Sequence, residues 1–183
     1  MQAKLRFLGA AQNVTGSRHL LEVDDTRILV DCGLYQERQF TARNWEPFEV
    51  PPASIKAVLL THAHLDHCGL LPKLVKEGFK GRVYCTAATA EIAHIILLDA
   101  AKIQEEDAVY KRKRHKREGR EGPHPDAPLY CAADVEACRP LFAPVPYGEP
   151  VKIAPGVEAT FSEAGHVLGS SFILVSIQHD GET

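Results

Sequence analysis

The segment THAHLDH at residues 61–67 places four side chains that can ligate a metal within six residues. His62, His64, Asp66 and His67 combine imidazole and carboxylate donors, which suit zinc, with manganese or iron as alternatives. Because no cysteine belongs to the group, a closed structural zinc site is not indicated. In a tight loop, residues two positions apart can converge on one metal, and Asp66 and His67 would then face an adjacent position. The spacing therefore favours two metals roughly 3.5–4 Å apart.

Two other interpretations of this segment are a solvated turn and a buried polar cluster satisfied by backbone groups. Burying neutral histidines beside an aspartate costs free energy that a metal would offset, which favours the metal site. Asp31 in VDCG ends a strand and could orient a metal-bound histidine, or could simply form a turn. His166 follows a strand in AGHVLGSS at 164–171, where small neighbours let the backbone approach a site. On its own, a histidine in such a turn is more often structural.

The elements before the motif are expected to be short strands. Apolar and polar residues alternate in three runs near the N-terminus, the last two forming a hairpin: residues 4–10, 18–23 and 26–31. Residues 33–54 contain turn-forming glycine and proline and are expected to be a loop with one short helical turn. The apolar segment 55–61 is typical of a strand buried on both faces. It leads directly into the metal-ligand motif.

The elements after the motif are expected to alternate between helices and strands. A short helix at 70–78 precedes a strand at 82–86. A long helix runs from Ala87 to about Arg117 without Gly or Pro. Its apolar positions at helical spacing are Ile92, Ile95, Ile96, Ala100 and Ile103. A connection rich in helix-breaking residues at 118–128 follows, then a short helix at 134–142 disturbed by Pro140.

The C-terminal third is expected to form three strands: residues 150–154, 157–164 and 170–177. The final HDGET carries an Asp-Gly pair after an alternating strand, which predicts the turn of a further hairpin. Strands, helices and strands again predict an α/β fold with mixed sheets and flanking helices.

The composition excludes several classes of protein. With 183 residues, 45% of them hydrophobic and 25% charged, the chain is typical of one soluble domain, neither disordered nor collagenous. It has no apolar stretch of the ~18 residues that a spanning helix needs and no secretory signal, so we expect a cytoplasmic protein without a membrane partner. Five scattered cysteines without a CxxC pair indicate neither a disulfide framework nor a thiolate zinc site.

A basic segment interrupts an otherwise slightly acidic chain with a formal net charge of −3. It is KRKRHKR at 111–117, and its candidate phosphate contacts are Lys111, Arg112, Lys113, Arg114, Lys116 and Arg117. The alternative is a solvated helix end whose cations complement the helix dipole. No independent RNA-binding signature accompanies the segment.

Three of these motifs resemble those of the metallo-β-lactamase superfamily: Asp31 in VDCG, THAHLDH at 61–67 and AGHVLGSS at 164–171. The segments 7–23, 31–37 and 64–74 resemble more narrowly its β-CASP branch of RNA-processing nucleases. This resemblance covers nearly the whole chain. It implies an αββα four-layer sandwich, of which residues 1–183 would be the N-terminal part.

The resemblance also implies a division of labour among the ligands. His62, His64 and His166 would hold one zinc, while Asp66 and His67 would contribute to a second. A water acidified by the cations would attack phosphorus in RNA, so the reaction class would be phosphodiester hydrolysis. Of the two acidic residues implied in catalysis, Asp66 would act as a metal ligand and Asp31 as support for the ligands.

The chain departs from the family pattern after the third motif. The bridging aspartate, the inserted β-CASP domain and the last strands of the metallo-β-lactamase domain are expected beyond Thr183, so the chain is expected to be part of a longer enzyme. The intact family site holds two zinc ions, and one or none is expected here. A sheet without its closing strands exposes apolar surface and edges, which predicts a homo-oligomer.

Three functions remain open from the sequence. The first is an RNA-cleaving nuclease of the β-CASP type, in which this part of the chain is itself active or inactive. The second is a metallo-β-lactamase-fold hydrolase of thioesters or small phosphodiesters, because the HxHxDH motif alone does not select the substrate. The third is a non-catalytic protein that keeps the fold and at most one metal.

Overall fold

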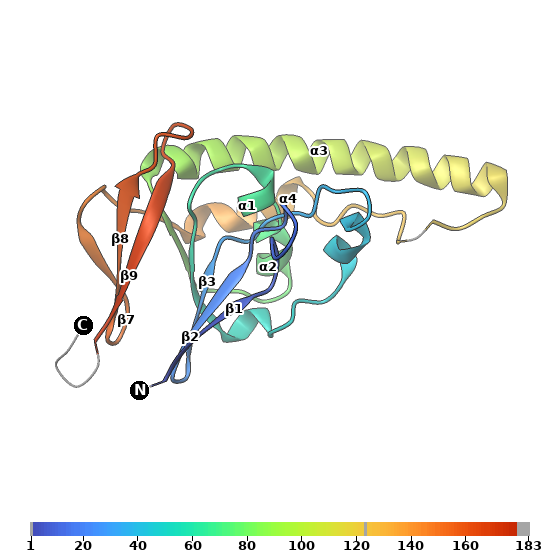
Figure 1. Cartoon of the computed structure of the whole chain (residues 1–183). Coiled ribbons are helices and arrows are strands. Elements are labelled where there is room, and N and C mark those ends of the chain that lie inside the picture. The colour runs from blue at the N-terminus through green and yellow to red at the C-terminus, as the bar shows by residue number, and fades with distance from the viewer. Residues whose placement is uncertain (1, 123, 179–183) are drawn as a thin grey trace.

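Two β-sheets lie face to face in the computed structural model, which describes residues 2–122 and 124–178 (Figure 1). The larger sheet has six strands in the order of the chain: β1 (Ala3–Phe7), β2 (His19–Val23), β3 (Thr26–Val30), β4 (Ile55–Leu59), β5 (Arg82–Cys85) and β6 (Phe142–Pro144). The smaller sheet has three: β7 (Pro150–Ala154), β8 (Val157–Glu163) and β9 (Ser171–Ile177). Strands β1 to β3 pair antiparallel, β3 to β6 pair parallel, and the smaller sheet is antiparallel throughout.

Helices cover the face of the larger sheet that points away from the smaller one (Figure 1). They are α1 (Leu65–Cys68), α2 (Leu71–Lys76), α3 (Ala87–Glu118) and α4 (Ala132–Cys138). Short 3₁₀ turns occupy Thr41–Trp45, Pro52–Ser54 and Arg139–Leu141. The hydroxyl of Thr86 accepts a hydrogen bond from the amide of Thr89 and caps the start of α3, and Gly119 ends the helix in the left-handed conformation.

Strand β4 supplies both hydrophobic cores, as the prediction of a strand buried on both faces requires. Because side chains alternate along a strand, Val58 and, directly after the strand, Leu60 face the helices while Ala57 and Leu59 face the smaller sheet. Phe161 of β8 fills the core between the two sheets. Helices, larger sheet and smaller sheet supply three layers of the expected four-layer sandwich. On the outer face of the smaller sheet, Phe172 and Leu174 are 60% and 62% exposed.

The structure corrects four details of the predicted elements. The helix expected to reach residue 142 ends at Cys138, and residues 142–144 form the edge strand β6 instead, because Pro140 interrupts the helix. Residues expected in a turn, 65–68, form α1. The loop 33–54 contains two 3₁₀ turns rather than one helical turn.

The fourth correction concerns which face of α3 is buried. Ile95 and Ile103 are 66% and 57% exposed, although both belonged to the predicted apolar face. The buried face instead carries small residues, including Ala93, Ala101 and Ala108. The turn predicted at HDGET, residues 179–183, lies outside the described residues. Within the described ranges, no helix is both long and apolar enough to cross a membrane.

Candidate metal centre

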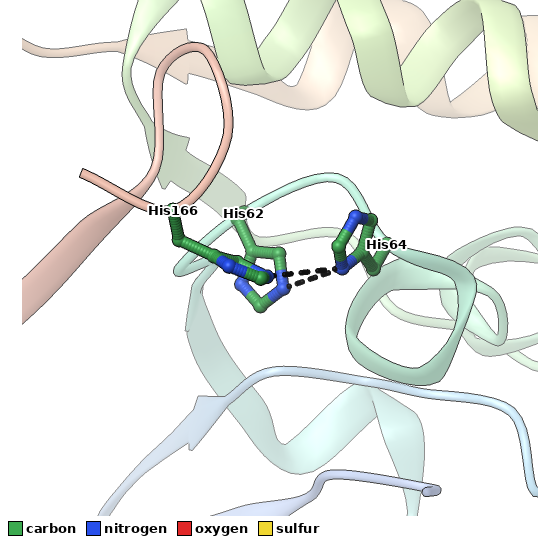
Figure 2. A group of neighbouring side chains, drawn as sticks. All are labelled: His62, His64 and His166. Atoms are coloured by element: carbon green, nitrogen blue, oxygen red, sulfur yellow. Dashed lines mark hydrogen bonds between the residues drawn. The ribbon is translucent and has the colours of Figure 1, made fainter. Parts of the chain in front are cut away.

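The predicted ligands come together where strands of the two sheets meet. His62 and His64 follow β4 of the larger sheet, and His166 lies in the loop between β8 and β9. The amide of Ser171 at the start of β9 donates to the carbonyl of Thr61 at 2.9 Å, which joins the two sheets beside the site. Figure 2 shows the three imidazoles facing one another.

The three imidazoles surround one point in space. Nδ1 of His64 lies 3.2 Å from Nε2 of His62 and 3.3 Å from Nε2 of His166. One nitrogen of each ring lies within 4.8 Å of the other two. Three nitrogen ligands without a fourth protein donor are the set used by catalytic zinc, which keeps one position open for water or substrate. The donor chemistry of this cluster therefore fits a divalent transition metal.

His62 is held in the form that can donate a lone pair to a metal. Burial, followed by the neighbouring His67, lowers the pKa of His62 to about 4, so the ring is neutral near pH 7. The hydroxyl of Thr61 donates to the carboxylate of Asp31 at 3.0 Å, and so can accept from Nδ1 of His62 at 2.9 Å. The lone pair on Nε2 then points to the centre of the cluster.

Asp31 is the buried acceptor beneath the cluster. Its side chain is nearly inaccessible and accepts hydrogen bonds from the amide of Thr61 at 2.9 Å and from the hydroxyl of Ser17 at 3.3 Å. Its φ of 59° is uncommon for a residue other than glycine, so the backbone is strained at this position. Nδ1 of His67 lies 2.7 Å from Asp31 Oδ2. One carboxylate thus orients the second candidate metal position as well as the first.

Asp66 and His67 lie together on α1, beside the three-histidine cluster. Nε2 of His67 is 3.6 Å from Oδ2 of Asp66, and the rings of His67 and His62 have their centroids 4.0 Å apart. Burial lowers the pKa of His67, but the hydrogen bond and charge of Asp31 outweigh burial and raise the pKa above its ordinary value. This pair offers two donors next to the first position, where the sequence predicted a second metal.

Residues that the sequence did not single out hold the loop of His166. The hydroxyl of Ser170 accepts hydrogen bonds from the amides of His166 and Val167, both at 3.1 Å. The hydroxyls of Thr86 and Thr89 donate to the carbonyl of Gly169 at 2.7 and 2.8 Å. The start of α3 therefore anchors this loop, and the small residues around His166 were the only signal of this arrangement in the sequence.

A close backbone contact holds α1 against the loop that follows β3. A Cβ added to Gly33 would lie 1.6 Å from the carbonyl oxygen of Asp66, so only glycine fits there. The same carbonyl accepts a hydrogen bond from the amide of Ser17 at 2.8 Å. The VDCG motif therefore positions Asp66 through Gly33, in addition to supplying Asp31.

The basic segment 111–117 lies at the far end of α3, and its residues face different sides. His115 is buried, with its Nδ1 2.7 Å from a carboxylate oxygen of Asp126. Lys111 pairs with Asp107 at 2.6 Å. The exposed cations of the segment are Arg112, Lys113, Lys116 and Arg117, while Arg114 is half-buried. Only part of the segment is thus free to meet a polyanion.

Comparisons with known proteins agree with this fold. A family model described as the metallo-beta-lactamase superfamily matches residues 16–169, so the chain belongs to this superfamily. It is 40% identical over 175 residues to ribonuclease TTHA0252 of Thermus thermophilus, covering 96% of this chain and 35% of that protein. It is 35% identical over 182 residues to the transcription termination factor FttA of Methanocaldococcus jannaschii, covering 98% of this chain and 25% of that protein.

A solved structure supports the fold alone. MEM-A1, a subclass B3 metallo-beta-lactamase from a soil metagenome library, superposes with a TM-score of 0.55 at 19% identity, covering 97% of this chain and 56% of that one. The chain spans about a third or less of the length of the two curated relatives. The expected membership of the superfamily and the α/β fold with mixed sheets are confirmed.

Proposed function

We propose that this chain forms part of a metal-dependent RNA-cleaving nuclease of the β-CASP type. The observation that carries the proposal is the convergence of His62, His64 and His166 from two sheets onto one point. A relative named a ribonuclease, 40% identical across nearly the whole chain, supports RNA as the substrate. The activity would be hydrolysis of a phosphodiester bond by a water molecule.

The candidate ligands would form two neighbouring metal positions. His62, His64 and His166 would hold one zinc, and Asp66 and His67 would contribute to a second position that is weaker with two donors. A bound divalent cation lowers the pKa of its water to near neutrality and polarises the phosphoryl oxygens. The carboxylate of Asp31 accepts hydrogen bonds from the hydroxyl of Thr61 and from Nδ1 of His67, and these contacts would direct the imidazole lone pairs toward the metal positions.

The exposed cations of the basic segment would contact the RNA backbone. Arg112, Lys113, Lys116 and Arg117 are open to solvent at the end of α3. Each phosphate contact adds to the salt dependence of binding, so affinity should fall as salt concentration rises. Lys111 and Arg114 would make weaker contacts with the RNA backbone, because Lys111 already pairs with Asp107 and Arg114 is half-buried.

The test is metal content together with cleavage. Elemental analysis of the purified chain and of His64→Ala should show about one zinc per chain in the wild type and a loss in the variant, because His64 lies beside both other ligands. Cleavage of a labelled single-stranded RNA, by this chain or by a longer protein that contains it, should stop on adding a chelator. His94→Ala is the matched control, because His94 lies on α3 outside the cluster.

A chain that binds zinc equally well with and without His64 would contradict the proposed site. Cleavage that persists in the chelator would contradict the proposed chemistry.

Self-association and a cytoplasmic location also stay predictions. Phe172 and Leu174 form an exposed apolar pair on the outer face of the smaller sheet, which favours association of copies of this chain. Light scattering at moderate concentration should give a mass above that of one chain, and a monodisperse monomer would contradict this expectation.

A further inference from the structure

A cavity of about 330 Å³ lies between the segment after β3 and the middle of α3. Its volume is within the range of pockets that bind small molecules, near the lower end. Most of its wall is apolar, with contributions from Leu34, Leu65, Ala100, Ile103 and Leu129. The metal ligands do not use this cavity, and the proposed function does not account for it.

Aromatic residues form a further part of the wall, beside polar residues such as Gln104 and Lys111. The indole of Trp45 stacks on the imidazole of His124, with ring centroids 3.8 Å apart and an interplanar angle of 9°. Tyr35 also lines the cavity and is held in place by Asn44, whose amide group makes two 2.9 Å hydrogen bonds with the Tyr35 backbone. The Tyr35 ring itself is buried, so a flat ring that enters this cavity would meet the Trp45–His124 pair, which is already positioned.

The wall that contains His124 is fastened to α3. Nδ1 of His115 lies 2.7 Å from Asp126 Oδ2, which draws the connection after α3 back against the helix. Gln104 of α3 accepts a hydrogen bond from the amide of Leu129 at 3.1 Å. Both contacts hold the connection just after His124, at Asp126 and at Leu129, close to where it meets Trp45. The cavity is thus formed before a ligand arrives.

One cation at the cavity can reach a phosphate. Lys111, the first residue of the basic segment, lines the cavity and pairs with Asp107 at 2.6 Å, so a bound phosphate would share or replace that carboxylate as its partner. A mostly apolar cavity with an aromatic pair and a lysine at its edge matches the two parts of a nucleotide, its base and its phosphate. Neither a phosphate alone nor an aliphatic ligand would use both features.

The cavity adjoins the metal centre through the chain itself. Leu65, which lines the cavity, stands between the candidate ligands His64 and Asp66. The amide of Leu34, another lining residue, donates to the carbonyl of Leu65 at 2.9 Å. A strand of RNA that crosses the metal centre could therefore place a nearby base in the cavity.

We infer that this cavity binds one nucleobase of a single-stranded RNA, with the phosphate of that nucleotide directed to Lys111. The inference rests on the proposed function for its substrate, and it adds a base-binding subsite next to the metal centre. Stacking on aromatic rings is tolerant of sequence, because every base has a flat π-face. The subsite would therefore position the chain of the RNA more than select its sequence.

The protein carries its own probe of this cavity. Trp45 is the single tryptophan of the chain, so fluorescence excited selectively at the indole reports on the surroundings of Trp45 at the wall of the cavity. Titration with the four nucleoside monophosphates and a five-nucleotide RNA, in a chelator to prevent cleavage, should quench this fluorescence in a saturable way. Ribose 5-phosphate, which lacks the base, should leave it unchanged.

Two variants with matched controls test the walls. Ile103→Glu places a carboxylate at the cavity and should weaken nucleotide binding about tenfold or more, the loss expected when one stacked base is displaced. Ile95→Glu is its control, because Ile95 is as exposed on the same helix and does not line the cavity. Lys111→Gln should weaken binding and reduce its salt dependence, and Lys102→Gln, on α3 away from the cavity, should do neither.

The inference is overturned if nucleotides and RNA leave the fluorescence unchanged. It is also overturned if ribose 5-phosphate quenches as strongly as a nucleotide, or if Ile103→Glu and Ile95→Glu bind equally. The titration needs neither a metal nor cleavage of RNA, so its result tests the subsite independently of the proposed nuclease activity. If the chain binds nucleotides but does not cleave RNA, the base-binding subsite is supported and the proposed nuclease activity is contradicted. If it cleaves RNA but does not bind nucleotides in this titration, the activity is supported and the subsite is contradicted.

Discussion

The carboxylate of Asp31 lies 2.7 Å from Nδ1 of His67 and also accepts a hydrogen bond from the hydroxyl of Thr61. That hydroxyl contacts Nδ1 of His62, so one buried acid orients a histidine in each half of the candidate centre. In both rings the contact occupies Nδ1 and leaves Nε2 for a metal. The geometry makes Asp31 a positioning residue for the metal ligands, which gives its strained backbone a purpose.

Asp31→Asn should weaken metal binding by about 10–100-fold, the loss typical when the partner of a ligating histidine is removed. Asparagine tolerates the positive φ at this position, so the backbone should survive the change. Competition with a chromogenic chelator measures the affinity. Asp25→Asn, in the exposed turn between β2 and β3, is the matched control and should bind zinc like the wild type. Equal affinity in both variants would refute the role of Asp31.

Thr61→Val tests the relay from Asp31 to His62. Valine keeps the shape of threonine and removes the hydroxyl, so Nδ1 of His62 loses its 2.9 Å contact. Zinc affinity should fall by about tenfold or more for loss of a partner that orients a ligand. Thr61→Ser retains the hydroxyl and should restore most of the affinity, which a purely structural role for the methyl group would not allow.

The sequence was sufficient to place the candidate metal ligands. His62, His64 and His166 could be grouped because the HxHxDH spacing and a histidine in a glycine-rich turn resemble known motifs, and the structure brings their imidazoles together. The hydrogen bonds of Thr61 and Ser170 could not be predicted, because hydroxyl residues are common in turns and their partners depend on the tertiary fold.

The fold was predictable where local patterns are strong. The strand predicted at 55–61 forms over Ile55–Leu59, and the long helix after Ala87 is confirmed, because an uninterrupted apolar run and a stretch without Gly or Pro are strong local signals. The buried face of α3 was predicted wrongly. The isoleucines of this helix lie on several of its sides, and the buried side carries alanines. Close approach of a helix favours small side chains, a preference that hydrophobic periodicity does not register.

Gly33→Ala should destabilise the fold through the contact with Asp66. The added Cβ would lie 1.6 Å from a backbone carbonyl oxygen, so α1 or the loop after β3 must move. We expect a loss of about 1–3 kcal/mol or more in the free energy of unfolding, measured by urea titration.

Gly148→Ala is the control for Gly33→Ala. Its φ is +75° and a Cβ there would meet nothing within 4 Å, so only backbone strain of about 1 kcal/mol is expected. If Gly33→Ala costs no more than this control, the close packing of the two segments does not matter for stability.

Glu37 should make part of the stability depend on pH. Its carboxylate accepts hydrogen bonds from the hydroxyl and amide of Thr15 and from the amide of Val14, which lower the pKa of Glu37 from 4.5 to about 2. A carboxylate with a lowered pKa stabilises the fold fully above its unfolded value of 4.5. That contribution is lost as the pH falls toward 2.

The difference in unfolding free energy between wild type and Glu37→Gln should therefore be largest at neutral pH and shrink below pH 4.5. Urea titrations at pH 7, 5 and 3 measure it, using values at which both chains remain folded without denaturant. Glu105→Gln, at an exposed position of α3, should show little difference from the wild type at any of these values. A Glu37→Gln difference that stays constant from pH 7 to 3 would mean that the hydrogen bonds to Thr15 do not depend on the charge of the carboxylate.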